Sequence, residues 1–179
     1  MDALIRFSIL IDKMTEKFGL IANWLVLITC VISAGNAMMR YGFNMSSNAW
    51  LEIQWYLFGG MVMLGAANTL KVNGHVRVDV LYSRYSDRTR LWIDLLGGVF
   101  FLLPMAIIIG WLSWPMFINS FHIGETSGNS GGLLRWPVKL LVPLGFLLIT
   151  LQGISEIIKR VAALTGNLAL DAHYERPLQ

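Results

Sequence analysis

Few residues in this sequence could do chemistry, and they are scattered along the chain. The three histidines, His75, His122 and His173, fall outside the long apolar segments, and Cys30 is the single cysteine. A haem in a helical bundle needs paired histidines facing the interior, a zinc site needs clustered ligands, and a hydroxyl nucleophile needs a positioned base. The sequence therefore predicts no catalytic site, no metal and no cofactor, and Cys30 is interpreted as a buried side chain.

The carboxylates near the apolar segments are the remaining candidates, because an ionisable residue inside a membrane is costly and is often functional. Glu52 lies near the start of the second apolar segment, at the level where Arg40 ends the first. We predict a structural ion pair between Arg40 and Glu52; the alternative is a proton or cation site at Glu52. Asp94 and Glu156 lie near the opposite ends of their segments, within reach of water or of a nearby arginine. Because no series of acidic residues crosses the apolar segments, a self-contained ion-driven transporter is disfavoured.

Composition shows what must position these residues. Of 179 residues, 55% are apolar and 14% are charged, whereas about a quarter of a soluble domain is charged. The apolar residues form long runs, which is typical of a membrane protein. The net charge of +3 comes from Lys and Arg between these runs, so membrane topology accounts for it and no nucleic-acid partner is predicted.

The predicted fold is an all-α membrane protein with a single membrane domain, residues 1–179. In residues 2–18 the apolar residues fall on one face of a helix and the basic residues fall roughly opposite. This pattern predicts an amphipathic helix in the membrane interface; packing on a soluble partner is the alternative. Pro104 predicts a kink near Ile107 or just before it, and Asp87 is the expected N-cap of the third span. The four predicted transmembrane helices are about 19–39, 50–70, 91–114 and 136–158, and a connector begins at Pro115.

Basic residues set the orientation, because cytoplasmic segments carry an excess of Lys and Arg. With both termini cytoplasmic, the inner segments carry Arg6, Lys13, Lys17, Lys71, Arg77, Arg84, Arg88, Arg90, Lys159, Arg160 and Arg176. The outer segments carry Arg40, Arg135 and Lys139. Five of the inner residues are candidates for contact with phospholipid headgroups: Arg6, Lys13, Lys17, Arg84 and Arg88.

Several stretches, in this order and spacing, resemble one transporter family over nearly the whole chain. They are Arg40-Tyr41 with Trp50-Leu51-Glu52, Gly65-Ala66-Ala67, Gly74 to Asp79, and Gly131 to Pro137 followed by Pro143-Leu144-Gly145. The sequence thus resembles the small, DctQ-like membrane subunit of tripartite ATP-independent periplasmic (TRAP) transporters.

The resemblance implies a three-component system in the bacterial inner membrane. A periplasmic solute-binding protein captures an organic acid, and a large multi-span subunit carries the substrate and sodium sites. The small subunit supports the large one and helps to dock the binding protein, with segments 41–49 and 122–132 at the periplasmic side. By the same resemblance, His75, Arg77 and Asp79 belong to the cytoplasmic connector and act as local fold and interface residues.

Two other functions fit the architecture. A stand-alone homodimeric transporter would need a carboxylate central to a span, and Glu52 lies close to an end. An anchoring subunit of an unrelated complex, such as a respiratory enzyme, would be expected to carry haem or quinone ligands. By the resemblance, the binding protein selects the transported substrate, so these residues do not identify it.

Overall fold

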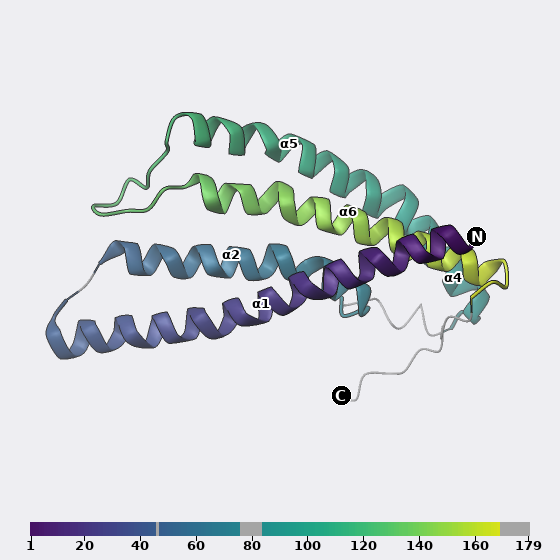
Figure 1. Cartoon of the computed structure of the whole chain (residues 1–179), viewed down its shortest axis with the longest axis horizontal. Coiled ribbons are helices and arrows are strands. Elements are labelled where there is room, and N and C mark those ends of the chain that lie inside the picture. The colour runs from purple at the N-terminus through teal and green to yellow at the C-terminus, as the bar shows by residue number, and fades with distance from the viewer. Residues whose placement is uncertain (46, 76–83, 169–179) are drawn as a thin grey trace.

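The computed structural model describes residues 1–45, 47–75 and 84–168, and these residues form long helices (Figure 1). The elements are α1 (Asp2–Phe43), α2 (Asn48–Lys71), α4 (Asp87–Gly97), the π-helical turn η1 (Gly98–Leu102), α5 (Leu103–His122) and α6 (Trp136–Leu164). The chain runs without a break from α4 through η1 into α5, so the described part contains four helical rods.

Helix α1 is a single helix of 42 residues, although the sequence predicted an interfacial helix over 2–18 followed by a separate span. Its buried positions are Ser8, Ile11, Thr15, Gly19 and Ala22. They recur every three or four residues across the expected boundary, so the amphipathic segment packs on the other helices and continues the span. At 1.5 Å per residue α1 is about 63 Å long, twice the roughly 30 Å hydrocarbon layer.

The third rod also differs from the prediction. Ser86, and not Asp87, is the N-cap, and its hydroxyl accepts from the Thr89 N–H at 3.4 Å. The irregular turn η1 lies ahead of Pro104, with the Leu103 N–H donating to the Gly98 carbonyl, whereas a kink was predicted near Ile107. Wider π-type turns accommodate a residue that cannot donate to the regular ladder.

The helix then continues to His122, through Pro115, where the sequence predicted a connector. Trp114, Phe117 and Phe121 follow one another along this extension, the first pair edge-to-face and the second tilted, with ring centroids 5.5 and 6.1 Å apart. Phe121 also meets Trp136 of α6 edge-on at 5.4 Å. These aromatic contacts stabilise the turns after the proline.

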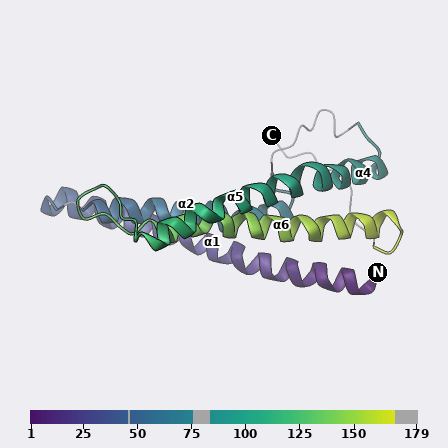
Figure 2. The ribbon, with the colours of Figure 1, turned by 90° about the horizontal axis from the view of Figure 1, so that it is seen from above.

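The rods lie side by side in the order α1, α2, α6, α5 (Figure 1). Seen from above they form a thin layer, from which the first half of α1 departs where it crosses α6 (Figure 2). The start of α1 and the end of α6 lie at one end of the layer, and the end of α1, the start of α2 and the connector 123–135 lie at the other (Figure 1). The buried core is small and lies where α1, α2 and α6 meet: Ala22, Leu64, Ala67 and Leu148. A single layer leaves broad apolar faces uncovered.

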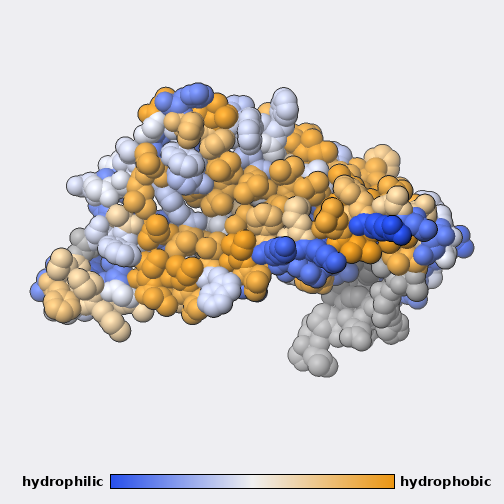
Figure 3. Space-filling view, viewed as in Figure 1, coloured by the Kyte–Doolittle hydropathy of each residue, from blue (hydrophilic) through white to orange (hydrophobic). Residues whose placement is uncertain are grey.

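Three described helical runs are long and apolar enough to cross a membrane: Asp2–Phe43, Asp87–His122 and Trp136–Leu164. Within the most apolar window of each, only 11%, 11% and 39% of residues are buried. Helix α2 is 24 residues long but is less apolar and is not among the three. Figure 3 shows apolar side chains over much of one broad face, and Cys30, expected to be buried, is exposed.

Candidate functional site

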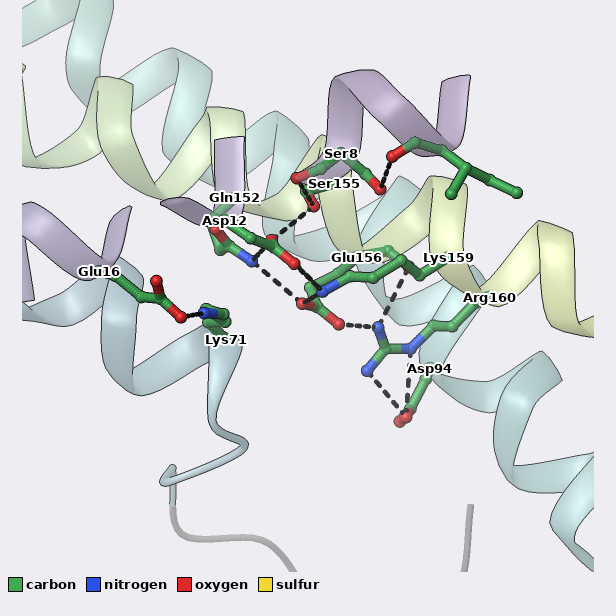
Figure 4. Close-up of polar contacts among 11 residues, drawn as sticks. Ser8, Asp12, Glu16, Lys71, Asp94, Gln152, Ser155, Glu156, Lys159 and Arg160 are labelled. Atoms are coloured by element: carbon green, nitrogen blue, oxygen red, sulfur yellow. Dashed lines mark hydrogen bonds and ion pairs between the residues drawn. The ribbon is translucent and has the colours of Figure 1, made fainter. Parts of the chain in front are cut away.

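A polar network joins three helices at the end of the layer that carries the start of α1 (Figure 4). We call it the helix-end network; its members are Ser8, Asp12, Asp94, Gln152, Ser155, Glu156, Lys159 and Arg160.

Asp12 connects α1 to α6 within this network. Its Oδ1 accepts from Gln152 Nε2 at 2.9 Å and from Ser155 Oγ at 2.8 Å. Its Oδ2 lies 3.1 Å from Lys159 Nζ, and both side chains are less than a fifth exposed. A largely buried carboxylate is costly unless it is paired and hydrogen-bonded. These contacts therefore fix the position of the first half of α1 on α6.

Glu156 and Arg160 extend the network to α4. Glu156 pairs with both Lys159 and Arg160 along its own helix. Arg160 reaches Asp94 of α4 through Nε at 3.3 Å and Nη2 at 3.2 Å, and its side chain is only 10% exposed. The two-nitrogen contact gives this pair a defined geometry, so α4 is held against the last turns of α6.

A further ion pair, Glu16 to Lys71, joins α1 to α2 beside the network (Figure 4). Each of the four rods thus has a charged contact with a neighbour at this end. Among the described residues, no group of three or more His, Cys, Asp or Glu side chains could hold a metal ion. The charged side chains at this end therefore neutralise one another across neighbouring helices.

A second cluster lies at the opposite end, where Glu52 of α2 binds the loop that joins α5 to α6. Glu52 Oε1 accepts from Asn129 Nδ2 at 2.8 Å and from the Ser127 hydroxyl. Its Oε2 accepts from the Leu133 backbone N–H at 2.8 Å. We call Glu52, Ser127, Asn129 and Leu133 the loop-anchor cluster. The carboxylate is stabilised by dipoles of a loop about 80 residues further along the chain.

Glu125 opens the same loop and faces the first turn of α6. It pairs with Lys139, and with Arg135 at 3.5 Å. The hydrogen bond from Lys139, reinforced by the positive charges of Lys139 and Arg135, lowers the pKa of the Glu125 carboxyl below its ordinary value. Glu125 therefore stays ionised and ties the loop to α6.

The predicted ion pair between Arg40 and Glu52 is absent from the described part of the structure. Arg40 is exposed, and Glu52 is occupied by the loop. The predicted partner of this carboxylate was a cation, whereas in the structure two neutral side chains and one backbone N–H donate to it.

The other predicted positions are only partly described. His75 is exposed at the end of the connector after α2, while Arg77 and Asp79 lie outside the described residues, so their interface role stays a prediction. The five basic residues predicted to meet lipid are all exposed: Arg6, Lys13, Lys17, Arg84 and Arg88. Asp94 and Glu156 do reach an arginine, Arg160, as predicted.

Sequence reasoning missed Asp12, Ser8, Ser155 and the role of Lys159. One signal was present: Gln152, Ser155, Glu156 and Lys159 share one face of a helix by their three- and four-residue spacing. That polar stripe continues past residue 158, where the predicted span ended, and α6 itself continues to Leu164.

Comparison with known proteins gives the family. The family model described as "Tripartite ATP-independent periplasmic transporters, DctQ component" matches residues 29–163. A protein of Haemophilus influenzae described as a "Putative TRAP transporter small permease protein" is 30% identical over 100 residues, which are 55% of this chain and 61% of that protein. The match thus spans less than two thirds of that relative, and no solved structure matches. With the family model covering most of the chain, the protein belongs to the DctQ family of TRAP transporter components.

Proposed function

We propose that this chain is the small membrane subunit of a sodium-driven, binding-protein-dependent transporter of organic acids. It supports the large transport subunit and helps to dock the periplasmic binding protein. The family match over residues 29–163 carries this proposal. The sparse burial of the spanning helices supports it, since their apolar faces remain for lipid and for a partner subunit.

In this proposal the chain crosses the bacterial inner membrane four times, with α2 as the fourth span. Helix α2 lies between α1 and α6, and Gly60, Leu64 and Ala67 are buried there. Its neighbours therefore shelter a helix that is less apolar than the others. An even number of crossings puts the start of α1 and the end of α6 on one side, and the Lys and Arg bias favours the cytoplasm.

The cytoplasmic end then carries the helix-end network and the exposed basic residues. Arg6, Lys13 and Lys17 on α1 contact anionic lipid headgroups, as do Arg84 and Arg88 before and within the first turn of α4. His75, Arg77 and Asp79 belong to the connector that meets the large subunit. Sodium and substrate sites lie on the large subunit.

The test is affinity purification of the tagged chain from its native membrane in mild detergent, followed by intact-mass analysis. We expect a large multi-span protein near one-to-one stoichiometry. The purified pair in liposomes should take up an organic acid only when the binding protein and an inward sodium gradient are both present.

The alternatives give different results in the same experiment. A homodimer that transports alone would overturn the proposal and redirect attention to Glu52. Recovery of a redox enzyme in place of a permease would favour an anchoring subunit. Uptake that persists without a sodium gradient would remove the sodium-driven part of the proposal.

A further inference from the structure

The connector between α5 and α6 is long but ordered. It runs over residues 123–135, since α5 ends at His122 and α6 begins at Trp136. Loops longer than about 12–15 residues without regular structure are uncommon in compact folds and are usually either functional or linkers, and this loop is close to that limit. This loop therefore calls for a reason beyond joining two antiparallel helices, for which about two to eight residues suffice.

Internal hydrogen bonds already give the loop a hairpin-like shape. The Ser127 N–H donates to the Leu133 carbonyl at 2.9 Å, and the Arg135 N–H donates to the Glu125 carbonyl at 2.8 Å. Thr126 and Leu134 form an isolated antiparallel bridge between these contacts. The positive φ of Gly131, 71°, suits a glycine at the return of the chain.

The loop-anchor cluster also fixes this hairpin to α2, a helix that the loop does not join. Glu52 accepts three hydrogen bonds from the loop. Asn48, one turn earlier on α2, donates from Nδ2 to the Ser130 carbonyl at 3.0 Å. The loop is thus held at the start of α2 as well as at its own ends.

The outer surface of the held loop combines exposed apolar and basic groups. Ile123 is 64% exposed and Leu134 is 46% exposed. The Arg135 side chain is 47% exposed although it also pairs with Glu125 at 3.5 Å, and Arg40, in the last turn of α1, is exposed. An apolar centre with a polar rim is typical of protein interfaces, and the exposed guanidinium groups fit a partner surface that carries carboxylates.

We propose that Glu52 is a positioning residue that holds the 123–135 loop in one conformation as the receiving surface for the periplasmic binding protein. This inference rests on the proposed function, in which this end of the layer faces the periplasm. The binding protein offers an apolar patch beside carboxylates. A loop ordered before binding avoids the entropy cost of ordering it in the complex, so Glu52 acts on the affinity of docking and leaves turnover unchanged.

The test uses the complete complex in liposomes, with uptake measured at increasing concentrations of substrate-loaded binding protein. Glu52→Gln removes the charge that two side chains and one N–H share. We expect the half-saturating concentration of binding protein to rise about tenfold, the equivalent of one charge-assisted hydrogen bond. The maximal rate and the yield of the large subunit should stay at the wild-type level. A purely structural role would lower yield or maximal rate instead.

Two further variants separate loop position from folding of α2. Asn129→Ala removes one contact from the loop side and leaves α2 unchanged, so it should shift the half-saturating concentration in the same direction. Gln54→Ala is the matched control, because Gln54 donates to the Trp50 carbonyl within its own helix; it should behave as wild type. Arg40→Gln should raise the half-saturating concentration and weaken its dependence on salt.

The outcomes distinguish the two proposals. If the wild-type chain recovers no large subunit or shows no binding-protein-dependent uptake, the proposed function fails. If wild type works but Glu52→Gln and Asn129→Ala leave the half-saturating concentration unchanged, the positioning role is refuted. Loss of assembly in both variants refutes it equally, because Glu52 would then serve the fold and not docking.

Discussion

Asp12 offers the sharpest test of the helix-end network, because it is the acidic group that binds α1 to α6. The substitution Asp12→Asn keeps the size of the side chain and removes its charge. The amide that replaces the carboxylate could still accept from Gln152 or Ser155, but the ion pair with Lys159, 3.1 Å in the structure, is lost. We expect α1 to loosen from α6 over its first half while the remaining helices stay packed.

The expected loss in the free energy of unfolding follows from the contacts that each former partner of Asp12 retains. Lys159 still pairs with Glu156, and Gln152 still donates to Glu156 at 3.0 Å. Ser155 still reaches the Ser8 carbonyl at 3.2 Å. Because no donor loses all its partners, the cost should fall below the roughly 3–5 kcal/mol typical of breaking a buried pair. One charge-assisted hydrogen bond, about 2 kcal/mol, is the expected loss in the free energy of unfolding.

The assay is reversible unfolding in mixed micelles, together with hydrogen exchange of the amides of residues 2–18. Asp2→Asn is the control: it makes the same chemical change on the same helix at an exposed residue, and it should cost less than about 0.5 kcal/mol. In a Lys159→Met background, Asp12→Asn should cost less than it does in wild type, since the shared contact is already gone. Equal stability of Asp12→Asn and Asp2→Asn, with unchanged exchange, would refute the anchoring role.

Two further predictions concern the loop between α5 and α6 and the contact between α2 and α6. Lys139 lowers the pKa of the Glu125 carboxyl below its ordinary value of 4.5. The ionised Glu125 should therefore stabilise the loop fully above pH 4.5, and this stabilisation should be lost as the pH falls through the lowered pKa of the folded state. Exchange of the Arg135 amide should report this loss, and Lys139→Gln should weaken the pH dependence; a loop that loosens as pH rises would contradict the argument. Gly145→Ala should cost about 1–3 kcal/mol, because its Cβ would lie 2.8 Å from Met63 Cβ and 2.9 Å from the Met63 carbonyl oxygen. Gly35→Ala, with nothing within 4 Å, should gain up to about 1 kcal/mol from helix propensity; equal stability of the two variants would argue against the close crossing.

The second helix and the start of the last could be placed from sequence, whereas most contacts between helices could not. The apolar run predicted as 50–70 corresponds to Asn48–Lys71, and the last helix begins at Trp136 as predicted. Residues 2–18 were ambiguous, because an amphipathic pattern fits a membrane interface and a helical neighbour equally well. Ser8 and Thr15, both fully buried, are small polar residues that mark neither environment.

The partners of Glu52 were unpredictable for a different reason. A charge in an apolar segment suggests an opposite charge nearby in the sequence, and Arg40 was the available cation. In the structure the Glu52 carboxylate instead accepts hydrogen bonds from Ser127, Asn129 and a backbone N–H. A Gly- and Ser-rich loop carries no sequence signal that identifies these groups as its donors. Only the pairing of the start of α2 with the return of the α5–α6 loop brings them together.

The two polar clusters explain how a single layer of helices can have a defined order. In lipid, apolar surface alone gives little preference for one helical neighbour over another, so close packing and polar contacts decide the arrangement. Asp12 with Lys159 fixes α1 against α6 at one end, and Glu52 fixes α2 to the loop between α5 and α6 at the other. Because the layer is pinned at its ends, the exposed apolar faces between them need not hold the subunit together. They remain open to lipid and, in the function proposed above, to a larger membrane partner.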